Sequence, residues 1–477
     1  MTKKARLSSA SSDADGVQLR LPPDLIQRIA LFLGDAPAFF NYLDAFQDTP
    51  SSLGSLQHLW VASFHAPFHM LWPELHVDEI SAARVAHLHT DRTYFRTIHV
   101  HAVFDLDLLA GCVSTTTSLS FHTCPVENEV SMPLDAWYRQ LAALPIAHLT
   151  WLKGTLTGIP HSLDVLLPVL PLLPLLTSLD VNSACFSSPD ALFAFVRDSK
   201  LTRLSIRNML TQQGNTYSAP TTLTRPALAA LTHWLSTQPV QVFSLGKWTM
   251  LAHAKMLSQL YDAIWSCPTL HTFHADYQHF PHLETYVFPA APLHIQRLNL
   301  TSCGITVAAA GNLAQALADS KVTWLNLSNN PIGAGGAHAL AVHALRRSKL
   351  RHLLLNHSRV GDLGCSHLAH ALAESALVEL SLDGNDLTDT SVLFLGYVLQ
   401  TAPTTTSVSL RANAISITSA AALVRSLGMR SCETAAVDLD DNPIDEVDQD
   451  MLETMVAKEQ MLRNCAFSCT SRFTGDE

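Results

Sequence analysis

The stretch from Trp324 to Leu345, WLNLSNNPIGAGGAHALAVHAL, contains the pattern that decides the fold. Its alternating Leu325 and Leu327 predict a short strand with one buried face, because successive side chains of a strand point to opposite sides. Asn330 follows, and glycines then lead into an alanine-rich run of helical composition. A single unit of strand, turn and helix cannot bury its apolar face alone. We therefore expect the unit to recur along the chain.

The unit does recur through the C-terminal half of the chain, in steps of 27 to 29 residues. So regular a step predicts stacked coils that share one continuous core. A polar or small residue follows three positions after each second apolar residue, where it can bond the backbone as the strand turns away. The apolar pairs are Leu298/Leu300, Leu325/Leu327, Leu353/Leu355, Leu380/Leu382, Val408/Leu410 and Val437/Leu439, and the turn residues are Cys303, Asn330, Ser358, Asn385, Asn413 and Asn442.

Weaker copies precede these six, and together they predict about thirteen strands over residues 95–444. The step from Leu204 to Phe243 is 39 residues, and we interpret the excess near residues 207–226, rich in Thr, Gln, Gly and Pro, as a protruding loop. Residues 445–462 predict a charged amphipathic helix that caps the open end of the core. We expect residues 1–17 and 463–477 to be disordered.

The chain resembles leucine-rich-repeat proteins of the ribonuclease-inhibitor type. Their motif, L-x-x-L-x-L-x-x-N/C-x-L, is matched nearly in full by Leu377, Leu380, Leu382, Asn385 and Leu387. The resemblance implies an α/β solenoid, a horseshoe whose parallel strands line the concave face and whose helices lie outside.

A small all-α module is predicted before the repeats, over residues 18–66. Pro22 and Pro23 precede Asp24, which is typical of a helix start, and Gly34 ends the apolar helical stripe. The segment resembles the F-box at Leu21, Pro22, Asp24, Leu25, Ile26, Ile29, Phe32 and Leu33, and Trp60 matches the tryptophan that often closes that module.

The F-box resemblance implies docking on the Skp adaptor of cullin–RING ubiquitin ligases. By that analogy the docking face is made of Pro22, Leu25, Ile26, Ile29 and Leu33. The alternative is that these helices only cap the repeat core and bury the same residues. An outward apolar stripe would favour docking, and burial against the first coils would favour a cap.

The residues between and after the paired leucines are expected to face outward on the concave side. This row is mostly uncharged and ends in acidic residues, as suits protein recognition better than catalysis. Its proposed partner-binding members are Asn299, Thr301, Asn326, Ser328, Asn356, Ser381, Asp383, Arg411, Asp438 and Asp440.

Composition excludes several other classes of function. A net charge of −11 argues against general nucleic-acid binding, which needs clustered Lys and Arg. The N-terminus lacks the apolar core of a secretory signal, and the nine cysteines form no C-x-x-C pair, so we expect a cytoplasmic or nuclear protein with reduced thiols and no membrane contact.

Catalytic and cofactor motifs are missing from the sequence. The GAGGAH run at residues 333–338 lacks the third glycine of a dinucleotide loop, and we interpret it as a structural turn. His99, His101 and His122 share an outward register, which leaves a metal site and solvated histidines both open. We expect no enzyme, no cofactor and no resident metal.

Two functions remain open. The first is the substrate-recognition subunit of an SCF-type ubiquitin ligase, with a protein target on the concave face. The second is a stand-alone scaffold or GTPase regulator, like ribonuclease-inhibitor-type repeats generally.

Overall fold

The computed structural model describes residues 21–78, 94–125, 129–152, 161–213, 216–218, 221–402, 404–429, 436–460 and 467–468. The chain divides into two compact units, residues 1–120 and 121–477. The expected disorder of residues 1–17 concerns residues outside this description.

The first unit begins with short helices packed on an aromatic core. They are α1 (Pro23–Leu31), α2 (Ala36–Asp44), the 3-10 segment Pro50–Leu56, α3 (Gln57–Ala62) and α4 (Phe68–Leu71). Asp35 caps α2, because its carboxylate accepts a hydrogen bond of 2.9 Å from the Ala38 amide. The ring of Phe39 stacks on that of Trp72 with centroids 4.1 Å apart, and Ile26, Ala30 and Leu43 are buried around them.

The first unit also contains strands. β1 (Leu75–Val77) pairs in parallel with β2 (Thr97–Val100), and α6 (Leu106–Cys112) follows. β2 lies within the predicted repeat region of residues 95–444, whereas β1 precedes it and was not among the predicted strands. β3 (Ser118–Phe121) spans the division between the units.

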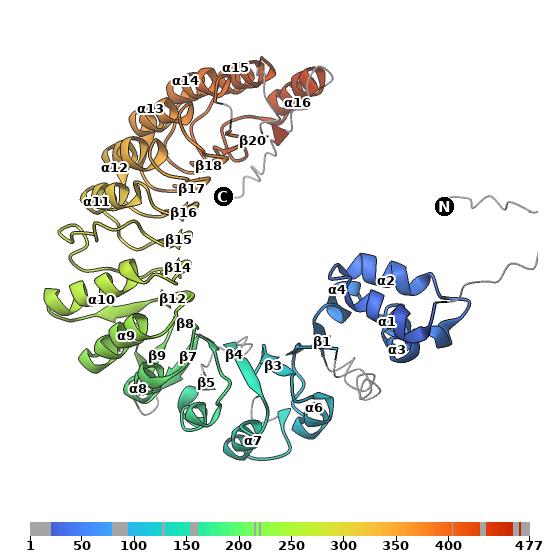
Figure 1. The fold of residues 1–477 in the computed structure, drawn as a ribbon. Helices are drawn as coiled ribbons and strands as arrows, with labels where there is room; N and C mark the ends of the chain where they lie inside the picture. The colour runs from blue at the N-terminus through green and yellow to red at the C-terminus, as the bar shows by residue number, and fades with distance from the viewer. Residues whose placement is uncertain are drawn as a thin grey trace, which may run out of the picture. The chain divides into compact units, whose positions relative to one another are not determined.

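The second unit is the solenoid that the repeat predicts. Its strands form one parallel sheet in which Leu298, Leu325, Leu353, Leu380, Val408 and Val437 lie opposite one another in register, each at most 1% exposed. Within this unit the strands line the concave inner side and the helices lie outside, as Figure 1 shows. The α/β leucine-rich-repeat fold is therefore confirmed.

The bounds of the solenoid's elements follow the predicted units closely. The strands, in sheet order, are β4 (Ile146–Leu152), β6 (Ser178–Asn182), β8 (Arg203–Arg207), β12 (Val242–Gly246), β14 (Thr272–His274), β15 (Arg297–Asn299), β16 (Trp324–Asn326), β17 (His352–Leu354), β18 (Glu379–Ser381), β19 (Ser407–Ser409), β20 (Ala436–Asp438) and β21 (Phe467–Ser468). The helices are α7 (Leu134–Leu141), α8 (Asp190–Asp198), α9 (Arg225–Thr237), α10 (Ala254–Ser266), α11 (Val307–Leu317), α12 (Gly333–Ala339), α13 (Gly361–Leu372), α14 (Asp389–Leu399), α15 (Ile417–Gly428) and α16 (Glu446–Gln460), with 3-10 turns at Leu163–Val165 and Leu170–Leu172 and a π-type turn at Leu340–Leu345.

The turn asparagines form hydrogen bonds between each coil and the one before it. Asn385 is fully buried, and its carbonyl oxygen accepts hydrogen bonds from the amides of Ser358 and Val360 at 2.9 and 3.1 Å. Its amide nitrogen donates to the Leu355 carbonyl at 2.8 Å. Asn330, Asn413 and Asn442 make the same kinds of bonds, so the expected ladder of polar turn residues is confirmed.

Ten coils in the described part of the second unit also turn through a left-handed residue, two positions after the second apolar residue. Most of the residues there are short, which suits a positive φ. They include Ser183, Asn208, Lys247, Tyr277, Ser302, Asn329, His357, Gly384, Ala412 and Asp441, with φ between 51° and 61°.

The GAGGAH run is the structural turn that we expected. Gly333 has a φ of 62°, and a side chain at Gly336 would lie 3.1 Å from the Ala310 Cβ and closer still to Ile332. The glycines therefore allow α12 to pack tightly against α11, which leaves no role for a phosphate loop.

Three features depart from the expected regular array. The insertion near 207–226 is not a plain loop: β9 (Leu210–Gln213) and β10 (Thr216–Ser218) pair antiparallel and extend a second sheet through β7 (Ala184–Phe186) to β5 (His161–Ser162). β11 (Thr221–Leu223) pairs with β13 (Trp248–Met250). Residues 276–296, all described, contain no helix. Finally, Phe467–Ser468 pair with β20 inside a tail that we expected to be disordered, and the rest of 463–477 lies outside the described residues.

Candidate functional site

The concave face of the second unit carries the polar row expected from the sequence. Its residues alternate with the buried leucines, and the sheet places them on neighbouring strands. Asn299, Thr301, Asn326, Asn356, Asp383, Arg411 and Asp438 are partly exposed, whereas Ser328, Ser381 and Asp440 are largely buried by their neighbours.

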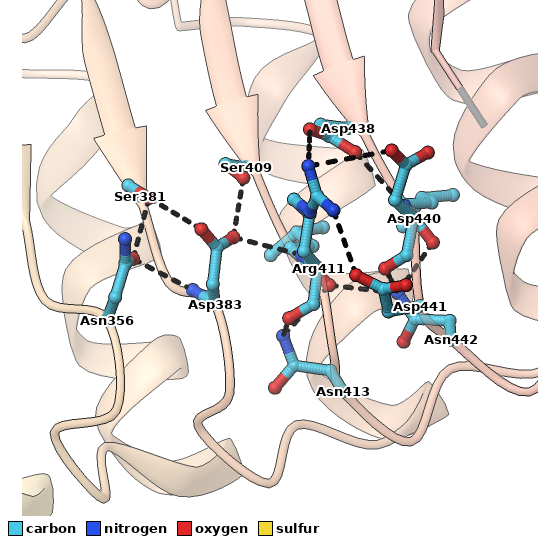
Figure 2. Close-up of polar contacts among 12 residues, drawn as sticks. Asn356, Ser381, Asp383, Ser409, Arg411, Asn413, Asp438, Asp440, Asp441 and Asn442 are labelled. Atoms are coloured by element: carbon cyan, nitrogen blue, oxygen red, sulfur yellow. Dashed lines mark hydrogen bonds and ion pairs between the residues drawn. The ribbon is translucent and has the colours of Figure 1, made fainter. Parts of the chain in front are cut away.

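Hydrogen bonds fix the side chains between β17 and β19, as Figure 2 shows. The Asn356 carbonyl oxygen accepts from the Ser381 hydroxyl at 2.6 Å and from the Asp383 amide at 3.0 Å. The Asp383 carboxylate in turn accepts from the Ser409 hydroxyl and from the Arg411 amide. Since each side chain is held by the next coil, this part of the row is ordered before any partner arrives.

Arg411 shares one guanidinium among three carboxylates (Figure 2). Its Nη2 lies 2.9 Å from Asp441 Oδ2, and its Nη1 lies 3.7 and 3.6 Å from Asp438 and Asp440. Burial, together with the negative charges of Asp440 and Asp383, raises the pKa of Asp438 above its usual value. The Asp383 carboxylate accepts from the Arg411 backbone amide, so this end of the row has four carboxylates and one cation and is acidic.

A second row of larger side chains was missed by the sequence reasoning. Each lies at the first position of its strand, directly before the first leucine. Arg297 lies over the Trp324 ring at 4.8 Å, and His352 Nδ1 lies 2.8 Å from Glu379 Oε2. The alternation of side chains gives these positions the same outward face as the residues between the leucines. This alternation was the sequence signal that could have predicted the second row.

The N-terminal helices present an apolar surface. Leu25 is 41% exposed, Ile29 36% and Phe32 88%. Leu21 is also exposed, and we call these four residues the α1 patch.

The other docking residues expected from the sequence lie differently. Pro22 is exposed, and Leu33 is partly exposed while its carbonyl accepts the Trp72 indole N–H at 2.6 Å. Ile26 is only 2% exposed. It belongs to the core of the first unit, because the helical stripe continues around α1 to the side that packs inward, and its expected place on the docking face is wrong.

The histidines that left a metal site open are divided between the units. His99 and His101 stack on His76 in the first unit, and His99 pairs with Glu74 at 2.8 Å. Burial and the neighbouring charges of His99 and His101 lower the pKa of His76 to about 4. His122 lies in the second unit, with its ring 5.5 Å from that of His148. Among the residues that the structure describes, no three His, Cys, Asp or Glu side chains are grouped to hold a metal ion.

Comparisons with known proteins agree with the repeats. A family model described as Leucine Rich repeat matches residues 319–341. NACHT, LRR and PYD domains-containing protein 5 of Homo sapiens is 38% identical over 109 residues, 22% of this chain and 9% of that protein. Ribonuclease inhibitor of Sus scrofa is 32% identical over 118 residues, 24% of this chain and 26% of the inhibitor. The chain thus spans a minor part of each of these relatives.

Among solved structures, the crystal structure of the Rad7 and Elc1 complex in yeast has a TM-score of 0.46 and 15% identity, covering 90% of this chain and 94% of that chain. No F-box family model matches. In the described part of the chain, no helix combines the length and apolar character needed to cross a bilayer. Together the repeats and their similarity to these relatives support a leucine-rich-repeat fold.

Proposed function

We propose that this scaffold is the substrate-recognition subunit of a cullin–RING ubiquitin ligase, with the α1 patch docking a Skp-type adaptor. The observation that carries the proposal is the exposure of Leu25, Ile29 and Phe32 at the positions of the F-box-like motif. A helix that served only to cap a core would turn these side chains inward. A continuous apolar patch on a helix is typical of an interaction site.

The concave row binds the target protein in this proposal. Its side chains between Asn356 and Arg411 are already held by hydrogen bonds. These side chains therefore lose less conformational entropy when a partner binds than those of a mobile surface would. The excess of carboxylates around Arg411 favours a target with a basic surface, and attraction of that kind weakens as salt is added.

The reaction itself takes place on a partner enzyme. The scaffold contributes proximity, because a target and an enzyme held in one complex react at a high effective concentration. No residue of this chain then needs to touch the reacting atoms, and the absence of catalytic motifs in the sequence agrees with this division of roles.

Binding to a purified Skp-type adaptor, measured by calorimetry, tests the proposal. Full burial of an apolar side chain is worth about 1.5–3 kcal/mol, so Leu25→Asp or Ile29→Asp should weaken binding at least about ten-fold. Val287→Asp is the matched control, since Val287 is exposed on the second unit. Circular dichroism checks that each variant is folded. No adaptor binding by the folded wild type, or equal binding by Leu25→Asp, would refute adaptor docking.

The second candidate is a stand-alone scaffold or GTPase regulator whose N-terminal helices act only as a cap. It is favoured by the identity to ribonuclease inhibitor, which is confined to about a quarter of that protein. In this case the α1-patch variants leave every partner interaction unchanged. If this protein leaves GTP hydrolysis by a Ran-type GTPase unaltered, a role as a GTPase regulator is excluded.

A further inference from the structure

A hollow of about 580 Å³ opens on the second unit where the chain leaves β8, β12 and β14, apart from the concave row. Met209, Trp248 and Met250 lie beneath it, and Lys247, Leu251 and Tyr277 stand around it. We infer that this hollow binds a segment of a partner protein through one bulky apolar side chain that is flanked by a carboxylate. The inference is independent of adaptor docking.

The floor of the hollow is rigid. The Trp248 indole N–H donates to the Ile206 carbonyl at 3.0 Å. The buried Gln278 side chain accepts from the Trp248 amide at 2.9 Å and donates to the Trp248 carbonyl at 2.8 Å, as a neighbouring strand would. The ring of Phe193 packs edge-on against Trp248. A binding site of this kind is formed before the ligand arrives, which reduces the cost of binding.

The rim exposes apolar side chains that the fold does not use. Leu251 is 73% exposed and Tyr277 is 61% exposed. Burying them against an apolar partner is favourable, at about 25 cal/mol for each Å² removed from water. The rim is open, so it suits one side chain of a longer segment better than a free small molecule, most of whose surface is usually buried in its pocket.

Two rim residues occupy strained positions. Lys247 and Tyr277 have φ of 59° and 53° at the left-handed position of their coils. Ser183, Ser302, Asn329 and Ala412 hold that position outside the hollow with short side chains, and His357 is the other long example. Long side chains in this conformation are uncommon, and backbone strain of this kind gathers at ligand clamps.

The charge of the rim selects the partner. Among the described residues of the lining, Lys247 is the one Lys, Arg, Asp or Glu, and its ammonium lies 5.4 Å from the centre of the Tyr277 ring. The chain as a whole carries a net charge of −11, so a cationic rim without a carboxylate is a local exception. A carboxylate next to the apolar anchor would gain a charge-assisted hydrogen bond from Lys247.

A random 12-residue peptide library displayed on phage is the probe. It is selected on the full chain and counter-selected on the Lys247→Glu/Leu251→Asp double variant. We expect enriched peptides with Asp or Glu next to a bulky apolar residue. The leading peptide is then synthesised with a fluorescent label, and its affinity is measured by polarisation. Both substituted side chains are exposed, so the variants should fold.

Leu251→Asp and Lys247→Glu should each weaken the binding of the peptide at least ten-fold. Replacing the acidic residue of the peptide by Lys should restore part of the affinity that Lys247→Glu loses. Val287→Asp and Lys349→Glu are matched controls at exposed sites outside the hollow and should change nothing. Enriched peptides without an acid, or affinity that the rim variants leave unchanged, would overturn the inference. Self-association in sedimentation that Leu251→Asp abolishes would also overturn it, because the occupant would then be a second copy of this chain.

Discussion

Replacing Asn385 by alanine should cost the protein more stability than the loss of a typical buried polar residue. The side chain satisfies the amides of Ser358 and Val360 and the carbonyls of Leu355 and Asp383, the last at 3.2 Å. An unsatisfied buried donor or acceptor costs about 1–3 kcal/mol. The Asp383 carbonyl also accepts from the His357 amide at 2.7 Å, so three groups lose their partner in the variant. At the low end of that range, three such groups give a loss of about 3 kcal/mol in the free energy of unfolding.

Urea unfolding followed by circular dichroism measures the loss in the free energy of unfolding. Hydrogen exchange shows which amides lose their hydrogen bonds. In Asn385→Ala the amide protons of Ser358 and Val360 should exchange much faster, because both lose their acceptor. Thr390→Ala, at an exposed position in the same coil, should change neither quantity. A loss below about 1 kcal/mol, with the two amides still protected, would refute the reasoning, since the ladder would then be replaceable by water.

Three further outcomes are expected. Leu380→Ala should lower the free energy of unfolding by about 2–5 kcal/mol through a core cavity, whereas Leu393→Ala, half-exposed on α14, should cost far less in the same urea titration. Arg411→Gln should lower the free energy of unfolding by about 1 kcal/mol at low salt and by less at 1 M salt. Because the pKa of Asp438 is raised in the folded protein, its protonated form stabilises the fold, and this stability should be lost as pH rises through that pKa. The pKa of His76 is lowered to about 4, so its neutral form should contribute stability above about pH 6.5 that is lost as pH falls toward 4. In His76→Gln the urea midpoint should therefore depend less on pH between these values. A pH profile equal to that of the wild type would contradict this.

The solenoid could be predicted from the sequence because the residues that repeat at each step have one structural role each. Leu325 and Leu327 define a buried strand face, and Asn330 defines the turn that follows. The same pattern repeated at nearly constant steps leaves little freedom in how the coils stack. The helix bounds followed less closely: the helical runs from Val307 and Thr390 predict the starts of α11 and α14 to within a residue, whereas those from Ala337 and Cys365 begin four residues after the starts of α12 and α13.

The inserted hairpin was missed because its strands pair with each other and with a second sheet instead of with the repeat. The sequence did contain a signal: Gly214 and Asn215 separate two segments rich in Thr, Gln and Tyr, which is typical of a hairpin. Ile26 was placed wrongly for another reason. Helical spacing shows which residues share a broad stripe, but it does not show where along that stripe burial stops.

The sites were harder to predict than the fold. The row between the leucines follows from strand alternation, but its hydrogen bonds from Asn356 through Asp383 depend on the stagger of neighbouring coils. The hollow beside Trp248 joins residues from three coils, and no local pattern in the sequence indicates that they meet.

The interrupted outer layer between α10 and α11 has a mechanical consequence. The sheet runs unbroken from β14 to β15, while residues 276–296 replace the helix that would brace this coil from behind (Figure 1). A curved slab resists bending through both of its surfaces, and here side-chain packing through Phe280, Leu283 and Tyr286 takes the place of a helix in the outer one. We therefore expect bending of the second unit to concentrate at this coil.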